Sequence, residues 1–318
     1  MPELPEVETV ARELDRAISG QKILAVKTSW PKIFSRSPGG FTRTRRELLG
    51  KTIQKVARSG KRIFIYLSPH LPENSRGSAT GMNGHHRNPH RMVQYPNGKW
   101  GGLSGDVIWV THLKMTGLFL YQPRHSYILK NVRMSWGKHV RAEFKLSRGM
   151  LYFSDIRKFG RMIVGKREVI LKHKDIVSLA PDPFQISLDR LKAALQKRTI
   201  PIKQALLDQK VIAGIGNIYA DEILWAAKIH PLLVARNINE KNIKNIIAHA
   251  RRILKKSIKY GGTSMRDFKN IKGVKGGYLA FCKVYGREGK SCKRNCGDTI
   301  NRIVIGSRST RFCPKCQR

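Results

Sequence analysis

The last four cysteines of the chain have the spacing of a metal site. Cys292 and Cys296 form one close pair, and Cys313 and Cys316 form a second pair after sixteen intervening residues. Tetrahedral zinc in structural sites commonly takes two thiolates from each of two tight turns. Four unpaired buried cysteines are the alternative, which this spacing disfavours. The sequence therefore predicts one structural zinc ion on these four residues, and it leaves Cys282 as a core residue.

The first residues offer a different chemistry. Once the initiator Met1 is removed, Pro2 becomes a secondary amine whose pKa lies several units below that of a lysine. Such an amine can attack an electrophilic sugar carbon, and the resulting cationic iminium acidifies the neighbouring C–H bond and permits elimination. Glu3 is placed to supply or accept the proton. An ordinary helix start with a proline is the preferred interpretation of this stretch considered alone.

Three further segments have residue types suited to a nucleic acid. Residues 308–312 (RSTRF) put two arginines on a predicted hairpin tip, where they suit phosphate, although a solvated turn fits equally well. Residues 214–222 (GIGNIYADE) join a glycine-rich turn to a helix that can bind phosphate, which alone is a weak signal. Residues 154–161 (SDIRKFGR) suit a wedge that enters a base step, although a Phe folded onto the core is commoner.

Other isolated residues have ordinary interpretations. Lys61 stands at the start of a predicted strand, and Met115 stands at a turn after one, so a surface lysine and a core methionine are the defaults. His85, His86 and His90 lie in a Gly- and Asn-rich stretch with no carboxylate nearby. A flexible insertion explains these histidines better than a metal site does.

The charge of the chain is its strongest global feature. Its 318 residues contain 62 Lys and Arg against 21 Asp and Glu, a formal net charge of +41. An excess spread through the whole chain indicates a polyanionic partner, with nucleic acid first and an anionic membrane surface second. No stretch is apolar enough to span a membrane, and the N-terminus lacks the pattern of a signal peptide. We expect a cytoplasmic protein of two domains.

The elements that must position these residues follow from periodicity. Apolar residues recur at helical spacing from Val7 to Ile18, after Pro5, which predicts an amphipathic helix. Strands are then predicted at 22–29, 51–58, 61–67, 107–113, 117–122, 139–146, 150–154 and 161–164. A basic, turn-rich loop is expected between the first two strands, and a long mobile loop at 69–106. Several short strands after one helix favour a β-sandwich.

The second half of the chain is predicted to be helical. The composition shifts near residue 166 towards a linker that ends in Ala180-Pro181-Asp182-Pro183. Helices are predicted from Ser187 to Gln196, over 203–209, from Asn217, and from an Asn239 cap to Gly261-Gly262. The final segment, 278–318, carries short strand-like runs between its cysteines.

Five of these segments resemble, in the same order, the motifs of the bacterial formamidopyrimidine-DNA glycosylases. Residues 2–9 (PELPEVET) are similar to the N-terminal signature of that family, and 203–209 with 214–222 are similar to its helix-two-turn-helix. The resemblance covers 2–317 apart from the loop at 69–106. It implies an α+β fold with two domains: an N-terminal β-sandwich with an N-terminal helix, and a C-terminal helix-two-turn-helix domain with a zinc finger. DNA would lie in a basic cleft between them.

The resemblance also implies boundaries within the chain. We expect a catalytic β-sandwich domain at 1–165 with the 69–106 insertion, a linker at 166–186, a helix-two-turn-helix domain at 187–277 and a zinc finger at 278–318. The family's lesion-capping loop should fall near 271–277. Cys292 and Cys296 are separated by three residues where the family has two, which is still within the range of ligand loops.

The family's functional residues can be carried over to matching positions. Pro2 would be the nucleophile, Glu3 would handle the proton, and Lys61 would be the second essential amine. Arg308 would bind phosphates beside the lesion and assist the second elimination. The expected DNA contacts are Met115, Arg157 and Phe159, which would fill the gap left by a flipped nucleotide, and Arg198, Lys203 and Asn217, of which the last two take phosphate-binding places.

The resemblance implies a DNA repair enzyme. The expected function is a bifunctional glycosylase and abasic-site lyase that excises oxidised purines, such as 8-oxoguanine and formamidopyrimidines, from duplex DNA. The expected partner is double-stranded DNA with an oxidised base or an abasic site, bound by a monomer with no role for a membrane. One alternative is the sister group that removes oxidised pyrimidines, which usually has Gly where this chain has Leu4. The other alternative is a non-catalytic protein that binds damaged DNA.

Overall fold

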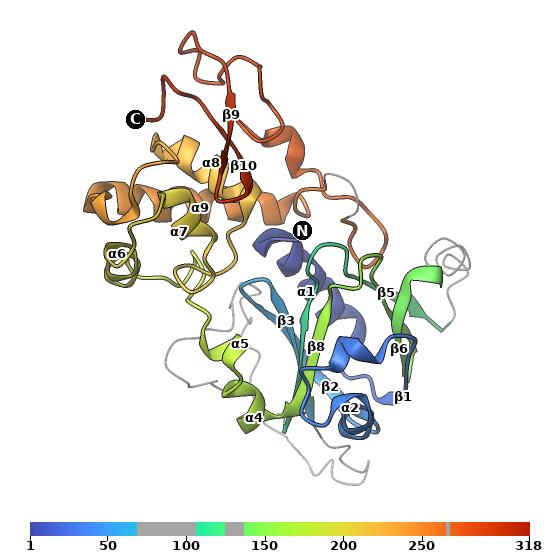
Figure 1. The fold of residues 1–318 in the computed structure, drawn as a ribbon. Coiled ribbons are helices and arrows are strands. Elements are labelled where there is room, and N and C mark those ends of the chain that lie inside the picture. Colours follow the sequence, from blue (N-terminus) through green and yellow to red (C-terminus); the bar gives the residue numbers. More distant parts are fainter. Residues whose placement is uncertain (69–105, 125–136, 265–267) are drawn as a thin grey trace, which may run out of the picture. The chain divides into compact units, whose positions relative to one another are not determined.

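The computed structural model describes residues 1–68, 106–124, 137–264 and 268–318. It has a mixed α+β fold (Figure 1) that separates into two compact units. Unit 1 comprises Met1–Val10, Ser59–Arg62 and Lys172–Arg318, and unit 2 comprises Ala11–Arg58 and Ile63–Leu171. Within the described ranges, no helix is long and apolar enough to cross a membrane. The predicted loop at 69–106, with its three histidines, lies outside the described residues except for Asp106.

Unit 2 is built on two four-stranded sheets, with strand orders β1-β6-β7-β5 and β2-β3-β4-β8. The strands are β1 (Ile23–Thr28), β2 (Thr52–Ser59), β3 (Arg62–Ser68), β4 (Val107–His112), β5 (Leu118–Pro123), β6 (Val140–Leu146), β7 (Gly149–Ser154) and β8 (Arg161–Lys166). Trp109 of one sheet packs on Phe119 and Phe144 of the other, with ring centroids 6.0 and 4.3 Å apart. These aromatic contacts between facing sheets form a sandwich core, which confirms the predicted strands and the predicted β-sandwich.

The N-terminal helix α1 (Leu4–Ile18) has the buried stripe that its sequence predicts, including Val7, Val10 and Leu14. The strand-to-strand loop predicted after β1 is different, however. It contains a 3₁₀ helix (Pro31–Phe34) and the helix α2 (Gly40–Leu48), which buries Thr44 and Leu48 one turn apart. The helix begins after two glycines, contains several arginines and buries only two residues, so its sequence shows no clear helical period. The prediction of a loop was therefore wrong here.

Short helices also occupy part of the predicted linker. They are α4 (Arg167–Leu171), which buries Ile170, and α5 (Lys174–Val177), whose His173 ring accepts a hydrogen bond from the Asp175 N–H. Helices of one turn bury too few residues to produce a visible period, which explains why composition alone suggested an irregular linker.

Unit 1 contains the start of α1, the short helix α5 and four longer helices among its described residues. The longer helices are α6 (Leu188–Gln196), α7 (Ile202–Leu207), α8 (Asn217–Ala227) and α9 (Glu240–Lys259). The predicted caps are confirmed, since the Ser187 and Asn239 side chains accept hydrogen bonds from the N–H groups of Arg190 and Asn242. All residues of α8 from Tyr219 to its end at Ala227 are buried. Because it is buried on every side, α8 is the central helix of this unit.

A β-hairpin completes unit 1. Its strands are β9 (Asn301–Ile305) and β10 (Arg308–Phe312), which pair antiparallel. Gly306 and Ser307 connect them with φ values of 51° and 62°. Two successive left-handed residues are typical of a type I′ turn, which suits the twist of a tight hairpin. The turn leaves Arg308 exposed as the first residue of β10.

Candidate functional site

The N-terminal tip lies against the start of α8. The Leu4 N–H donates to the Gly214 carbonyl at 3.0 Å, and the Ile218 N–H donates to Glu3 Oε1 at 3.0 Å. A Cβ at Gly216 would lie 2.3 Å from Glu3 Cδ, and a Cβ at Gly214 would lie 2.6 Å from Leu4. The glycine-rich segment therefore lets the tip approach the helix closely. The Ile218 N–H, which lies in the first turn of α8, binds the carboxylate of Glu3.

Glu3 is the buried carboxylate at this tip. Burial raises the pKa of Glu3, while the Lys61 ammonium and the N–H groups of Ile218 and Gly216 oppose that rise. Among the described residues, its second oxygen, Oε2, has no hydrogen-bond partner. A carboxyl with a raised pKa and one oxygen that makes no other hydrogen bond suits a general acid beside Pro2.

Lys61 reaches the same tip from the turn between β2 and β3. Gly60 precedes it with a φ of +55°, and a Cβ there would lie 3.1 Å from the Ala213 side chain. The turn is therefore pressed against the segment that leads to α8. Lys61 is buried, and its charge is the largest of the effects that lower the pKa of Glu3. The structure thus brings Pro2, Glu3 and Lys61 together, as the resemblance implied.

Glu6 forms a second buried carboxylate site behind the tip, which the sequence reasoning missed. Its Oε2 accepts the Glu3 N–H at 2.8 Å, and its Oε1 accepts the Thr263 N–H and the Tyr219 hydroxyl, each at 2.6 Å. The Tyr219 hydroxyl also contacts Ser257 Oγ at 2.6 Å. Burial and the charge of Glu3 raise the pKa of Glu6 to about 7. Glu6 therefore joins the tip to α8 and to the chain beyond α9.

Arg308 and Asn217 lie on neighbouring elements of unit 1. Asn217 is the first residue of α8, and its Nδ2 donates to the Ser309 carbonyl at 3.0 Å. Its Oδ1 has no hydrogen-bond partner in the part of the chain that the structure describes. Since Ile218 binds Glu3 and Asn217 binds the hairpin, the first turn of α8 connects the acid of the tip to the strand that carries Arg308.

Lys203 was expected to contact a phosphate, but the structure places its side chain in the interior. Its side chain is completely buried, and its Nζ lies 2.6 Å from Asp221 Oδ1. The same ammonium donates to the Ser309 carbonyl at 2.9 Å and to Thr310 Oγ1 at 2.8 Å. The sequence predicts that residue 203 lies on a helix, but it does not show which side of α7 faces the interior. Arg198, the remaining expected contact in this unit, is half-buried and pairs with Asp208 at 2.9 Å.

Met115, Arg157 and Phe159 lie together in unit 2, as the resemblance implied. Arg157 Nη1 lies 2.9 Å from Met115 Sδ, and the guanidinium stands 4.6 Å from the centroid of the Phe159 ring. Met115 is 40% exposed and Phe159 is 47% exposed. An aromatic ring held out in solvent by a cation is consistent with a wedge, and it excludes the alternative of a Phe folded back onto the core.

Asp155 shapes the loop that presents these side chains, and the sequence reasoning assigned it no role. The carboxylate is fully buried, and it accepts hydrogen bonds from the Thr116 hydroxyl, from the Arg157 N–H at 3.2 Å and from the Gly160 N–H at 2.6 Å. Lys158 between them has a left-handed φ of 56°. Asp155 thus bridges the two turns that carry Met115 and Phe159.

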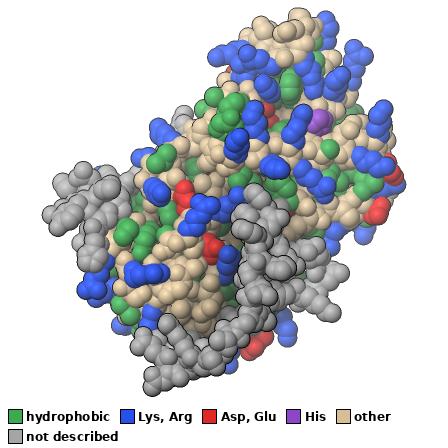
Figure 2. Space-filling view, turned by 180° about the vertical axis from the view of Figure 1, so that it is seen from behind, with side chains coloured by type: hydrophobic (Ala, Val, Ile, Leu, Met, Phe, Trp, Pro, Cys, Tyr) green, Lys and Arg blue, Asp and Glu red, His purple; other side chains and the backbone are tan. Residues whose placement is uncertain are grey.

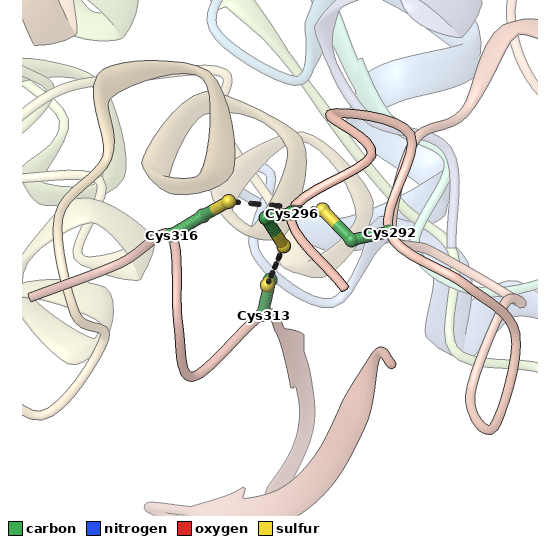
Figure 3. Close-up of side chains that lie close together, drawn as sticks. All are labelled: Cys292, Cys296, Cys313 and Cys316. Atoms are coloured by element: carbon green, nitrogen blue, oxygen red, sulfur yellow. Dashed lines mark hydrogen bonds between the residues drawn. The ribbon is translucent and has the colours of Figure 1, made fainter. Parts of the chain in front are cut away.

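The four C-terminal cysteines converge in unit 1 (Figure 3), with all ligand atoms within 4.8 Å of one another. The sulfurs of Cys296 and Cys313 are 3.5 Å apart, and those of Cys292 and Cys316 are 3.9 Å apart. Tetrahedral zinc with bonds of about 2.3 Å separates its sulfurs by about 3.8 Å, so the arrangement fits one structural zinc ion. The three-residue loop between Cys292 and Cys296 turns at Asn295, which has a left-handed φ of 53°. Cys282 is a buried core residue, as predicted.

The surface matches the charge of the sequence. Figure 2 shows Lys and Arg side chains spread over the face that it displays, with few Asp and Glu among them. A positive surface of this kind attracts a polyanion without fixing where it binds.

Comparisons with known proteins agree with this geometry. Family models match residues 1–162 (Formamidopyrimidine-DNA glycosylase N-terminal domain), 179–269 (Formamidopyrimidine-DNA glycosylase H2TH domain) and 289–318 (Zinc finger found in FPG and IleRS). The formamidopyrimidine-DNA glycosylase of Streptococcus pyogenes is 35% identical over 100% of this chain and 99% of its own length.

Solved structures of Lactococcus lactis Fpg have the same fold. The complex with DNA that contains an abasic site is 31% identical, covers 99% of both chains and has a TM-score of 0.77. A variant in complex with DNA that contains Fapy-dG is 31% identical, covers 100% of both chains and has a TM-score of 0.78. The chain therefore belongs to the formamidopyrimidine-DNA glycosylase family, and it is a zinc-containing DNA glycosylase of base excision repair.

Proposed function

We propose that this glycosylase is bifunctional: it excises oxidised purines from duplex DNA and then cleaves the strand through a covalent intermediate on Pro2. The observation that carries the proposal is the convergence of Pro2, the buried carboxyl of Glu3 and the ammonium of Lys61 at the start of α8. An amine nucleophile beside an acid with a raised pKa and a second cation is the combination that an iminium mechanism requires.

Recognition begins with the DNA duplex. The excess of Lys and Arg supplies long-range attraction to phosphate, and Asn217 and Arg198 are proposed contacts to the backbone. The damaged nucleotide is extruded, and Met115, Arg157 and Phe159 enter the space that it leaves. The unstacking of a base step costs a few kcal/mol, which an inserted apolar group offsets. The two exposed apolar side chains held by Arg157 meet this need.

Excision then uses the tip. The Pro2 nitrogen forms a bond to C1′ of the deoxyribose as the bond from C1′ to the base breaks. Glu3, in its protonated form, supplies a proton to the departing base. The resulting carboxylate takes the proton that the Pro2 nitrogen loses and passes it to O4′ as the sugar ring opens. The product is a cationic iminium that links Pro2 to the ring-opened sugar. Lys61 lies close enough to lower the pKa of Glu3, and it stabilises the carboxylate that remains after proton transfer.

Strand cleavage follows from the same iminium. The positive nitrogen acidifies the C2′ hydrogen, whose loss expels the 3′ phosphate by β-elimination, and a second elimination expels the 5′ phosphate. Lys61 and Arg308 assist these steps, Arg308 by binding the phosphates beside the lesion. Water then hydrolyses the iminium and frees Pro2, which leaves a one-nucleotide gap. Zinc, held by the four cysteines, has a structural role and fixes the base of the hairpin that carries Arg308.

The proposed division of the chain follows these roles. The catalytic β-sandwich domain would extend over 1–165, the linker over 166–186, the helix-two-turn-helix domain over 187–277 and the zinc finger over 278–318. We propose that the protein acts on DNA as a monomer in the bacterial cytoplasm, where the nucleoid provides its substrate.

Borohydride trapping tests the proposal. Purified protein is incubated with an 8-oxoguanine duplex and borohydride, beside an undamaged duplex and the Pro2→Gly variant. We expect a covalent adduct with the lesion duplex and wild-type protein alone, in a preparation that mass spectrometry shows to lack Met1. Binding of the lesion duplex without an adduct would instead support a non-catalytic protein. A panel of duplexes with oxidised purines and pyrimidines separates the two glycosylase classes, and fastest excision of pyrimidines would overturn the purine assignment.

A further inference from the structure

The hairpin that carries Arg308 is seated on the helical part of unit 1 by polar side chains. Four side chains contact β10 or its turn: Lys203 and Gln204 of α7, and Asn217 and Asp221 of α8. We call these four residues the seat of the hairpin. A Cβ at Gly306 would lie only 1.8 Å from Gln204 Nε2, so the turn rests directly on α7. These four residues and the hairpin belong to one compact unit, and Cys313, one of the four cysteines that would hold zinc, follows the opposite end of the hairpin.

A buried ion pair forms the centre of this seat. Lys203 and Asp221 are both fully enclosed, with 2.6 Å between Nζ and Oδ1. The remaining ammonium protons have acceptors in the Ser309 carbonyl and Thr310 Oγ1, and Asp221 Oδ2 accepts the Arg311 N–H at 3.1 Å. Burial of two charges has a large desolvation cost, and an apolar pair of similar volume is often at least as stable. Stability alone therefore gives a weak explanation for this pair.

The contacts of the pair point to a role in geometry. They hold the backbone of Ser309 and Arg311 and the side chain of Thr310, the three residues that follow Arg308. The Ser309 carbonyl is also held by Asn217, whose neighbour Ile218 binds Glu3. The seat therefore fixes the distance between the hairpin strand of Arg308 and the acid at the N-terminal tip, by way of α8.

We propose that Lys203 and Asp221 are positioning residues for Arg308, and that Lys203 does not contact DNA. The proposal rests on the proposed function of Arg308 in strand cleavage. When the pair is broken, β10 loses its register on α8, and the Arg308 guanidinium no longer meets the phosphates in the geometry that elimination requires. Misplacement of a catalytic group by about 1 Å can cost roughly 100-fold in rate.

A double-mutant cycle tests this assignment. Lys203→Met removes the charge and keeps the length of the side chain, and it is measured alone and combined with Arg308→Ala. The readouts are single-turnover rates of base excision and of strand cleavage, and the fraction of product from the second elimination. We expect Lys203→Met to slow strand cleavage roughly 10- to 100-fold. In the Arg308→Ala background we expect it to add less than about threefold, because coupled residues are not additive.

Further measurements separate positioning from DNA contact and from unfolding. Hydrogen exchange of residues 309–312 should rise in Lys203→Met, with one zinc ion still bound per chain. Affinity for an abasic-site duplex should keep its dependence on salt concentration, whereas loss of a phosphate contact would reduce the slope of log K against log[salt] by about 0.9. Lys192→Met, which removes an exposed lysine paired with Glu240, controls for net charge and should change none of these quantities. If Lys203→Met does not fold, Asp221→Asn is measured in its place.

The outcomes are distinguishable. A reduced salt slope, or an effect that multiplies fully with Arg308→Ala, would overturn the positioning role and return Lys203 to the DNA contacts. An unchanged cleavage rate in Lys203→Met beside an impaired Arg308→Ala would also reject positioning, while leaving the proposed function intact. An Arg308→Ala variant with wild-type cleavage would remove the proposed role of Arg308 and this inference with it.

Discussion

The tip of unit 1 and the loops of unit 2 present their functional side chains in opposite ways. Glu3 and Lys61 are buried, and Glu3 accepts a hydrogen bond from the Ile218 N–H of α8. Met115 and Phe159 are 40% and 47% exposed, and both side chains contact the guanidinium of Arg157. Proton transfer requires a shifted pKa, which burial provides, whereas insertion into DNA requires an apolar surface that is accessible before binding. The comparison indicates that the groups proposed to transfer protons are buried, whereas the side chains proposed to enter DNA are accessible before binding.

The largest expected effect comes from a substitution of the buried carboxyl of Glu3. Glu3→Gln removes the acid and keeps the shape, so base excision should slow by about 10² to 10⁴-fold. Trapping on a duplex with a preformed abasic site should fall far less, because no base remains to depart. Single-turnover kinetics on both substrates measure the difference. Equal losses on the two substrates would show that Glu3 acts on Pro2 rather than on the leaving base.

The next largest effect is expected for the partly exposed side chain of Phe159. Phe159→Ala should slow excision from duplex DNA on the order of 10- to 100-fold, since the inserted ring offsets an unstacking cost of a few kcal/mol. The thermal midpoint of the free protein should stay unchanged, because the ring is exposed. Asp155→Asn is the matched control, because it should weaken the loop that carries Phe159 and also lower the thermal midpoint. A Phe159→Ala variant with wild-type rates would remove the wedge from the proposal.

The buried carboxylates also predict how stability depends on pH. The pKa of Glu6 is raised to about 7, so the folded state binds a proton that the unfolded state releases above its ordinary value of 4.5. The free energy of unfolding should therefore fall as pH rises from 4.5 to 7, by up to about 1.4 kcal/mol per pH unit for each such group. Urea unfolding across this range should show a shallower slope for Glu6→Gln than for wild type. A slope that Glu6→Gln does not alter would mean that the Glu6 carboxylate is ionised throughout the range.

The smallest expected effect concerns a partly exposed pair. Arg198 and Asp208 are both about one-third exposed, so loss of their ion pair should change stability by less than about 1 kcal/mol. If Arg198 contacts a phosphate, Arg198→Gln should reduce the slope of log K against log[salt] by about 0.9 and leave excision at saturating protein unchanged. Asp208→Asn should keep the wild-type slope. An unaltered slope in both variants would remove Arg198 from the DNA contacts.

Local signals in the sequence predict much of this molecule. The caps at Ser187 and Asn239, the strands and the cysteine cluster depend on neighbours along the chain or on a fixed ligand geometry, and all are confirmed. The resemblance to a family supplied the grouping of Pro2, Glu3 and Lys61, because no local pattern connects a residue at 61 to one at 3.

What the sequence could not predict depends on long-range packing. The stripe of α2 was hidden among arginines, and Lys203 has the composition of a surface residue although the fold encloses it completely. Glu6 and Asp155 were missed because a carboxylate in a turn or helix start is ordinary until its buried partners are known. A buried polar group must find a partner, and only the three-dimensional structure shows which partner that is.

The close approach of Gly216 to Glu3 limits how this chain can vary. With 2.3 Å between a Cβ at 216 and the Glu3 carboxyl carbon, even alanine at 216 would displace the acid. Positions 3 and 216 therefore constrain each other: a side chain at 216 would move the carboxyl that accepts the Ile218 N–H, and a shorter acid at position 3 would give up that contact.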